Sequence, residues 1–244
     1  MSTRLRYLLL QVRNHDDPMR QQEITCFAQA LRCDESQIGV FDLLNQTLNR
    51  DQLGRGDIFL IGGSGHYGAV ADVPWLDRAL DGLREIHRLS KPTFGSCWGF
   101  QAMSRAMGGA VIKDLGNAEL GTLPLRLTPA GRADPVFGPL GESFHGQMGH
   151  EDRVTRLPDD AVLLASSDRV AHQAYRFRNK PIYCTQFHSE LTQKGLLERV
   201  RAYPEYVERI SGMHYTDFAA DCHETPETTQ LLMRFARLMM QDTT

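Results

Sequence analysis

The sequence predicts an α/β fold: a single domain whose mainly parallel central sheet is flanked by helices, with an additional short-stranded sheet in the second half. In the first half, short β-type runs alternate with helical stretches, which is typical of a parallel sheet covered on both faces. Residues 110–187 instead contain short strands separated by turn residues. No repeat, low-complexity tract or clear linker divides the chain, so residues 1–244 are interpreted as one domain.

The spacing of apolar residues predicts the strands and helices of the first half. Residues 6–12 (RYLLLQV) form an apolar run typical of a buried strand, and Ile24, Phe27 and Leu31 recur on one face of a helix. The expected elements, in order, are a strand at 6–12, a helix at 19–32, strands at 38–43 and 57–61, a helix after Pro74, a strand at 91–94 and a helix at 101–107.

The sequence of the second half predicts a series of short strands followed by a C-terminal helix. The expected strands lie at 110–112, 122–127, 161–165, 173–177 and 181–187. Residues 227–240 form an amphipathic pattern and predict the final helix. The pattern of residues 193–226 is the least readable in the chain, and this segment is interpreted as an insertion before that helix.

Composition excludes several classes of protein. With 27 Lys+Arg against 30 Asp+Glu, the net charge of −3 predicts no nucleic-acid partner. No apolar run approaches the roughly 20 residues that cross a bilayer. The five cysteines are scattered without a CxxC pair, which favours a reducing, cytoplasmic setting over a disulfide framework. The histidines lack metal-ligand spacing, so we expect neither a metal nor a cofactor.

Residues 95–99 (GSCWG) place a cysteine between a predicted strand and a predicted helix. This is the setting of a nucleophile elbow, in which glycines permit a sharp turn and expose the nucleophile at the end of the sheet. The helix N-terminus behind Cys97 favours a thiolate, and the N–H of Trp98 is placed to hold an oxyanion. Read alone, the pattern leaves open that Cys97 is a small buried core residue.

A histidine and a carboxylate follow the last predicted strand. Residues two apart on a strand face the same side, so His188 and Glu190 are expected to hydrogen-bond. A carboxylate on one imidazole nitrogen fixes the tautomer and leaves the other nitrogen to act as a base. Any HxE pair is also compatible with a solvated surface histidine.

Residues 62–68 (GGSGHYG) follow the predicted strand at 57–61. Gly63, Gly65 and Gly68 match the G-x-G-x-x-G pattern of dinucleotide binding, but the next helix begins only after Pro74. We therefore favour a glycine turn that completes an oxyanion hole beside Cys97. A dinucleotide-binding oxidoreductase remains the least favoured alternative. Gln101, one helical turn beyond Cys97, is a candidate contact for a polar substrate.

Together these motifs resemble the class I, triad-type glutamine amidotransferase family, in the stand-alone branch similar to the amidotransferase half of GMP synthetase. The family pattern G-x-C-x-G-x-Q corresponds to Gly95, Cys97, Gly99 and Gln101. The pattern Q-F-H-P-E corresponds to residues 186–190, with Ser189 in place of proline. The branch's E-x-G element corresponds to residues 119–121. The resemblance covers residues 5–192 and the last helix, and it implies a flavodoxin-like sheet.

The resemblance also implies roles for particular residues. Cys97 corresponds to the nucleophile, His188 to the base and acid, and Glu190 to the orienting carboxylate. The remaining family sites fall on Gly63 and Trp98 as oxyanion donors, on Gln101 for the glutamyl group, and on Gly65, Gly149 and His150 beside the substrate. The usual Ser-His-Gly reads Gly149, His150 and Glu151 here, which bears on the identity of the substrate.

Two activities follow from this reading. One is hydrolysis of the γ-amide of glutamine through a glutamyl thioester, with the ammonia passing to a separate synthetase subunit. The other is hydrolysis of a γ-glutamyl peptide or conjugate, which requires no partner. A non-catalytic relative that acts by binding is the third alternative, and the complete Cys–His–Glu set argues against it.

Overall fold

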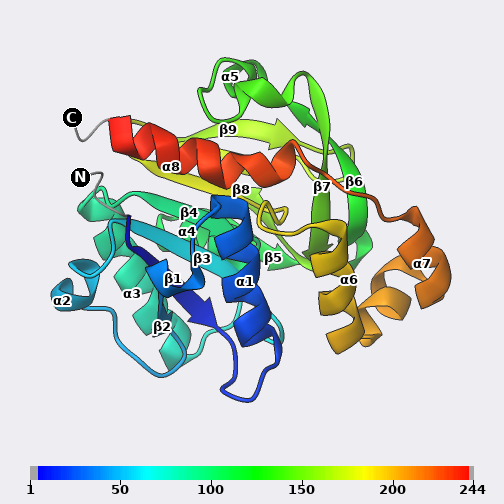
Figure 1. Cartoon of the computed structure of the whole chain (residues 1–244), viewed down its shortest axis with the longest axis horizontal. Helices are drawn as coiled ribbons and strands as arrows, with labels where there is room; N and C mark the ends of the chain where they lie inside the picture. Colours follow the sequence, from blue (N-terminus) through cyan, green and yellow to red (C-terminus); the bar gives the residue numbers. More distant parts are fainter. Residues whose placement is uncertain (1–4, 242–244) are drawn as a thin grey trace.

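The computed structural model describes residues 5–241, and its centre is one nine-stranded sheet with the order β2-β1-β3-β4-β11-β10-β9-β6-β7 (Figure 1). The parallel part consists of β2 (Ile38–Asp42), β1 (Tyr7–Val12), β3 (Ile58–Ser64), β4 (Thr93–Ser96) and β11 (Ile182–Thr185). The antiparallel part consists of β10 (Ala174–Phe177), β9 (Ala161–Ser166), β6 (Glu119–Leu127) and β7 (Ser143–His150). The predicted α/β class is confirmed.

A small second sheet pairs β5 (Ala110–Lys113) with β8 (Asp152–Arg156) in antiparallel register, as expected for the second half. The other short strands of that half extend the central sheet instead. β6 pairs with β7 over eight successive residue pairs, from Glu119 opposite His150 to Arg126 opposite Ser143. This long hairpin places residues 146–150 at the end of the sheet where β4 and β11 also finish.

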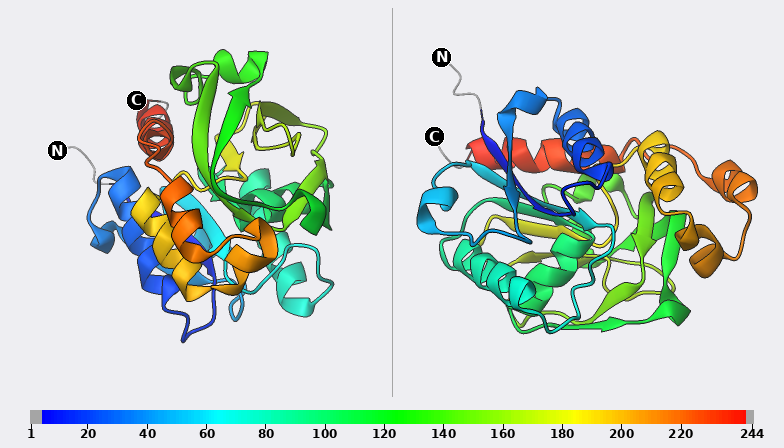
Figure 2. Two further views of the ribbon diagram at one scale, coloured as in Figure 1. Left: turned by 90° about the vertical axis from the view of Figure 1, so that its right-hand side faces the viewer. Right: turned by 90° about the horizontal axis from the view of Figure 1, so that it is seen from below.

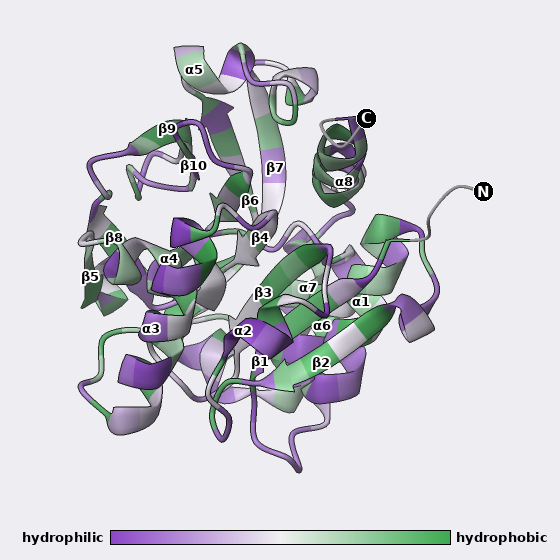
Figure 3. Ribbon diagram, turned by 90° about the vertical axis from the view of Figure 1, so that its left-hand side faces the viewer, coloured by the Kyte–Doolittle hydropathy of each residue, from purple (hydrophilic) through white to green (hydrophobic). Residues whose placement is uncertain are grey.

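Helices cover both faces of the sheet because the parallel strands are apolar on both sides. Every residue of β1 is buried. On one face, Leu9 packs in a core with α1 (Met19–Leu31) and α8 (Leu231–Gln241). On the other face, Leu10 packs with α3 (Pro74–Arg88) and α4 (Trp98–Ala106) (Figure 2). Figure 3 shows β3 in the hydrophobic colour between helices that carry hydrophilic residues.

Several boundaries differ from those predicted, for physical reasons. α4 begins at Trp98 rather than residue 101, because the turn at Cys97 leads directly into the helix. β11 ends at Thr185 rather than residue 187, since the N–H of His188 bonds to Gln147 of β7 instead of continuing the ladder. α8 begins at Leu231, after a 3₁₀ turn at Thr228–Gln230. Strands β7 and β8 were not predicted.

Residues 193–226, interpreted from the sequence as an insertion, form helices. They comprise α6 (Gln193–Ala202), a π-helical turn at Val207–Ser211, and α7 (Tyr215–Asp221). Leu196, Val200 and Phe218 are buried with Leu191 in a separate apolar cluster. The views agree that α6 and α7 lie at one end of the molecule, beside β6 and β7 (Figures 1 and 2). This segment therefore forms a wall next to the carboxyl ends of the parallel strands.

Short helical turns complete the described part of the chain: α2 (Arg50–Leu53), α5 (Pro129–Arg132), and 3₁₀ turns at Glu35–Gln37, Leu115–Asn117 and Gly138–Leu140. Within residues 5–241, no helix is long and apolar enough to cross a membrane. No disulfide links the five cysteines, all of which lie in the described range. The predicted domain also includes residues 1–4 and 242–244, which lie outside that range.

Candidate active site

Cys97 occupies a tight turn between β4 and α4. Its backbone has φ 52° and ψ −100°, a conformation that costs a non-glycine residue free energy and is concentrated at functional sites. Both sides of the turn favour glycine: a Cβ at Gly95 would lie 3.1 Å from the carbonyl carbon of Gly99, and a Cβ at Gly99 would lie 2.8 Å from the carbonyl oxygen of Ile61. The thiol is mostly buried, and Sγ lies 3.7 Å from the carbonyl oxygen of Gly149. The predicted elbow is therefore present, at the end of β4.

Two backbone segments lie against this cysteine. Trp98 is the first residue of α4, so its N–H has no acceptor within the helix. Gly63, near the end of β3, is so close that a Cβ there would lie 3.8 Å from the Cβ of Cys97 and 3.0 Å from Cε1 of His188. The predicted glycine turn thus lies beside both Cys97 and the imidazole of His188.

His188 is held between Cys97 and a buried carboxylate. Its Nδ1 lies 2.7 Å from Oε1 of Glu190, and both side chains are almost fully buried. Burial alone would lower the pKa of His188, but the charge of Glu190 and the interaction with Cys97 raise it to about 9. Burial likewise opposes ionisation of Glu190, yet His188 and Arg199 lower its pKa to about 2. The pair is therefore stabilised as imidazolium and carboxylate.

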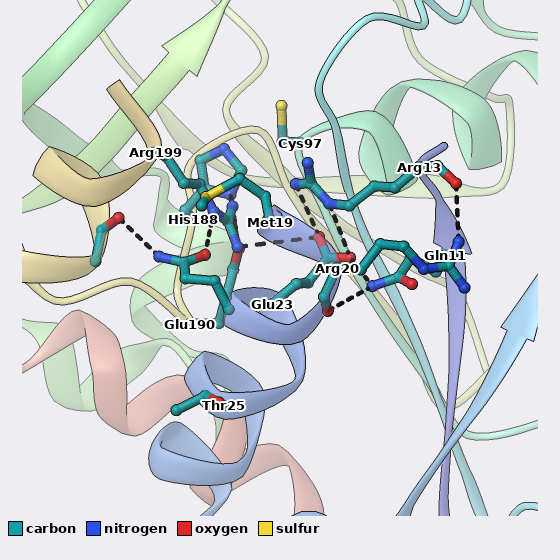
Figure 4. A network of polar contacts seen from close by, with 12 residues as sticks. Gln11, Arg13, Met19, Arg20, Glu23, Thr25, Cys97, His188, Glu190 and Arg199 are labelled. Atoms are coloured by element: carbon teal, nitrogen blue, oxygen red, sulfur yellow. Dashed lines mark hydrogen bonds and ion pairs between the residues drawn. The ribbon is translucent and has the colours of Figure 1, made fainter. Parts of the chain in front are cut away.

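Arg199 of α6 also belongs to this cluster, and sequence reasoning missed it. Its Nη1 donates to Oε1 of Glu190 at 3.1 Å and lies 3.2 Å from Nδ1 of His188 (Figure 4). Its Nε donates to Oε1 of Gln22 on α1 at 2.9 Å, which fixes the guanidinium from the other side. The chain around Arg199 reads as an ordinary charged helix, so no local signal identifies this residue.

A second buried ion-pair network continues from Arg199 toward β1 (Figure 4). Arg13 directs Nε and Nη2 to the two carboxylate oxygens of Glu23, both at 3.3 Å. Its Nη1 donates to the hydroxyl of Tyr203 at 2.9 Å. Tyr203 packs so closely on Gly65 that a Cβ at Gly65 would overlap the hydroxyl. The end of α6 is therefore tied both to Arg13, which directly follows β1, and to the predicted glycine turn.

Two predicted substrate contacts are engaged inside the protein. The amide nitrogen of Gln101 donates to the carbonyl oxygen of Asp152 at 2.8 Å and to Oε1 of Gln186 at 3.2 Å. His150 lies 2.9 Å from Oε2 of Glu119 and 3.0 Å from the carbonyl oxygen of Asp152. Both side chains are buried, and both brace the β7–β8 turn beside Cys97.

Glu151, which stands where the family pattern has glycine, is neutralised by two cations. Its carboxylate forms ion pairs with Lys113, at 3.3 Å, and with Arg209 of the π-helical turn. The next residue, Asp152, is buried beside the N–H of Ala69, and burial raises the pKa of its carboxyl. The carboxylate of Glu151, the departure from the family pattern noted in the sequence, is therefore engaged in ion pairs within the protein.

Two hollows meet at this cluster. The larger, of about 350 Å³, is lined by Cys97, Trp98, Gln101 and His150. The smaller, of about 50 Å³, is lined by His188 and by side chains of α6. Ser64, Gly65, Gly149 and Tyr206 border both.

Two other chemistries find little support in the described residues. No group of three or more His, Cys, Asp or Glu side chains within residues 5–241 is placed to hold a metal ion. The G-x-G-x-x-G pattern ends β3 and runs into a loop, and α3 begins only at Pro74. A helix N-terminus that could hold a pyrophosphate does not directly follow these glycines.

Comparisons with known proteins give one family. The family model described as "Glutamine amidotransferase class-I" matches residues 24–197. A GMP synthase (glutamine-hydrolysing) of Thermosipho africanus is 30% identical over 137 residues, which are 54% of this chain and 25% of that protein. Gamma-glutamyl peptidase 3 of Arabidopsis thaliana is 28% identical over 189 residues, covering 75% of this chain and 72% of the peptidase. The chain thus spans about a quarter of the GMP synthase.

Solved structures share the fold over nearly the whole chain. A glutamine amidotransferase from Thermotoga maritima superposes with a TM-score of 0.76 at 18% identity, covering 97% of this chain and 98% of its own. A glutamine amido transferase from Methylobacillus flagellatus gives a TM-score of 0.69 at 17% identity, covering 95% and 94%. At these identities the likeness establishes the fold.

Proposed function

Because the chain belongs to the class-I glutamine amidotransferases, we propose that it hydrolyses a γ-glutamyl amide through Cys97, His188 and Glu190. The observation that carries this proposal is the approach of three separate chain segments at one point. The strained Cys97 and the carboxylate-bound imidazole of His188 both lie against Gly63, where an added Cβ would be 3.8 Å from Cβ of Cys97 and 3.0 Å from Cε1 of His188. This combination is what acyl transfer to a thiol requires.

The reaction proceeds through a glutamyl thioester. Cys97 Sγ, having given its proton to His188, attacks the γ-carbonyl carbon, and the N–H groups of Gly63 and Trp98 hold the oxyanion. The imidazolium of His188 then gives the proton to the leaving nitrogen as the C–N bond breaks. Water, deprotonated by His188, attacks the thioester, releases glutamate and restores the thiol. Each oxyanion donor lowers the barrier by roughly 3–4 kcal/mol.

Glu190 and Arg199 set the charge of this centre from behind. Glu190 orients the imidazole through Nδ1 and leaves Nε2 for the thiol and the substrate. Arg199 donates to the same carboxylate oxygen, so it competes with the imidazolium for the charge of Glu190. We assign Arg199 as a positioning residue. By limiting how strongly Glu190 stabilises the imidazolium, it leaves His188 ready to release its proton.

The glutamyl portion is placed in the larger hollow, beside Gln101, Gly149 and His150. Gln101 and His150 act there mainly by shaping the β7–β8 turn, since their side chains are already hydrogen-bonded within the protein. Gly65 borders the same hollow. If glutamine is the substrate, the ammonia passes to a separate synthetase subunit, as the GMP synthase relatives suggest.

A second candidate is hydrolysis of a γ-glutamyl peptide or conjugate without ammonia transfer. It is favoured by the peptidase relative, which this chain covers over 72% of its length, compared with 25% of the first GMP synthase. Release of glutamate from glutamine and from γ-glutamyl dipeptides, measured side by side with the Cys97→Ala variant as the blank, tests both candidates. Equal turnover by the variant would refute the thiol mechanism for both.

A further inference from the structure

The reaction centre divides the substrate between the two hollows. Cys97 borders only the larger hollow, and His188 borders only the smaller one. Cys97 bonds to the acyl carbon, and His188 gives its proton to the leaving nitrogen. The acyl part therefore lies in the larger hollow, and the leaving amine enters the smaller one.

The smaller hollow exceeds the needs of ammonia. Its volume is about 50 Å³, whereas a water-sized molecule such as ammonia occupies roughly 10–15 Å³ by the same measure. There is room for a nitrogen that carries a short chain of carbon atoms. Its wall is aliphatic on one side, formed by Leu120 of β6, Leu191, and Leu196 and Val200 of α6.

The charged residues of this wall are already paired. Arg13 is bound by Glu23 and Asp17, and Arg199 by Glu190. A leaving group that carries its own charge would add a further charge beside these buried ion pairs, which is costly. An uncharged alkyl group instead gains the free energy of apolar burial against the aliphatic wall.

We propose that the smaller hollow is a leaving-amine pocket and that the preferred substrates are γ-glutamyl amides of short primary alkylamines. The proposal rests on the γ-glutamyl hydrolysis proposed above and names its substrate class. Glutamine and water fit the same centre, but glutamine leaves most of the pocket unfilled. Residues 193–226 would then determine specificity, because α6 supplies two of the aliphatic side chains and Tyr206 stands between the hollows.

The test compares kcat/KM for γ-glutamylethylamide, glutamine and γ-glutamylglycine. We expect the ethylamide to exceed glutamine by about tenfold, the effect of two carbons buried in an apolar pocket. The charged γ-glutamylglycine should fall below the ethylamide. Glutamine as the best substrate, or γ-glutamylglycine above the ethylamide, would overturn the proposal. Hydrolysis of none of the three would instead refute the proposed function itself.

A pocket-filling variant checks the location. Val200→Phe should lower the ratio of ethylamide to glutamine turnover about tenfold, because the ring occupies the space of the alkyl group. Leu197→Phe adds the same ring on the neighbouring, partly buried position of α6 outside the pocket, and it should leave the ratio unchanged. If Val200→Phe does not fold, Val200→Leu gives a smaller shift in the same direction. Equal ratios in the wild type and in a folded pocket-filling variant would contradict the assignment.

Discussion

Helices α4 and α6 supply groups to the same cluster, but they do so in different ways. α4 begins at the turn that holds Cys97, so the backbone itself places this thiol. α6 passes beside the site and contributes through side chains, chiefly the guanidinium of Arg199 on Glu190. A site can thus be fixed by chain geometry in one region and by buried charge in another.

The difference shows which contributions leave a trace in the sequence. The turn at Cys97 demands glycine at 95 and 99, and these glycines are visible as a motif. The ion pair of Arg199 with Glu190 requires only a cation at the right distance, which no short sequence pattern marks. Arg199 and the exposed Arg201 therefore look alike in the sequence, although their environments differ.

The largest effect is expected at the turn. Cys97→Ala should lower kcat by about 10⁴-fold or more, because it removes the proposed nucleophile. Cys33→Ala, at a partly buried thiol beyond the end of α1, should retain near wild-type turnover. Release of glutamate under saturating substrate measures both variants. Turnover within tenfold of wild type in Cys97→Ala would place the chemistry elsewhere.

The second largest effect is expected at Glu190, the carboxylate that contacts both His188 and Arg199. Glu190→Gln should reduce kcat by roughly 10²–10⁴-fold, since the imidazole loses its orienting partner. Without the negative charge, the pKa of His188 falls from about 9, so the alkaline limb of the pH–rate profile should move to lower pH. An alkaline limb that does not move would mean that His188 does not titrate in the reaction.

The contribution of α6 is tested by Arg199→Met, which should lower kcat/KM by about 10–100-fold, as is usual for residues that orient a reacting group. Loss of a cation raises the pKa of every nearby group, so both limbs of the profile should shift to higher pH. Arg199→Lys should restore part of the rate and the original profile. Arg201→Met, which only removes a cation stacked on Tyr215, is the matched control. A loss of rate with no pH shift would mean a purely structural role.

The last prediction concerns stability rather than rate. The lowered pKa of Glu190 contributes free energy that is present above about pH 4.5 and is lost as the pH falls toward about 2. Between pH 6 and pH 2, the unfolding free energy of the wild type should therefore decrease by up to about 3 kcal/mol more than that of Glu190→Gln. Urea unfolding at several pH values measures this difference. Glu198→Gln, at a half-exposed carboxylate on α6, should follow the wild type.

Much of the fold could be predicted because its signals are local. The apolar run of β1 and the helical spacing in α1 predicted those two elements to within one residue at each end. The starts of β4 and α4 were predicted two and three residues away from where they lie. β7 was missed because its sequence, SFHGQMGH, is polar and contains two glycines. Its pairing with β6 depends on contacts along the hairpin, which no short window displays.

The site divides in the same way. Cys97, His188 and Glu190 lie in short motifs, and the structure brings them together as expected. The wall formed by α6 could not be predicted, since Arg199 and Tyr203 find their partners at Gln22 and Arg13, more than 170 positions away in the chain. Gln101 and His150 were predicted as substrate contacts, and the sequence did not reveal that Asp152 and Glu119 already bind them.

The most direct measurement is the mass of the protein after reaction with an electrophilic analogue of glutamine. We expect one covalent adduct, located on Cys97 by peptide mapping, with labelling slowed in Arg199→Met and suppressed by a γ-glutamyl substrate. Absence of an adduct on Cys97, or equal labelling of the other four cysteines, would contradict the proposed mechanism.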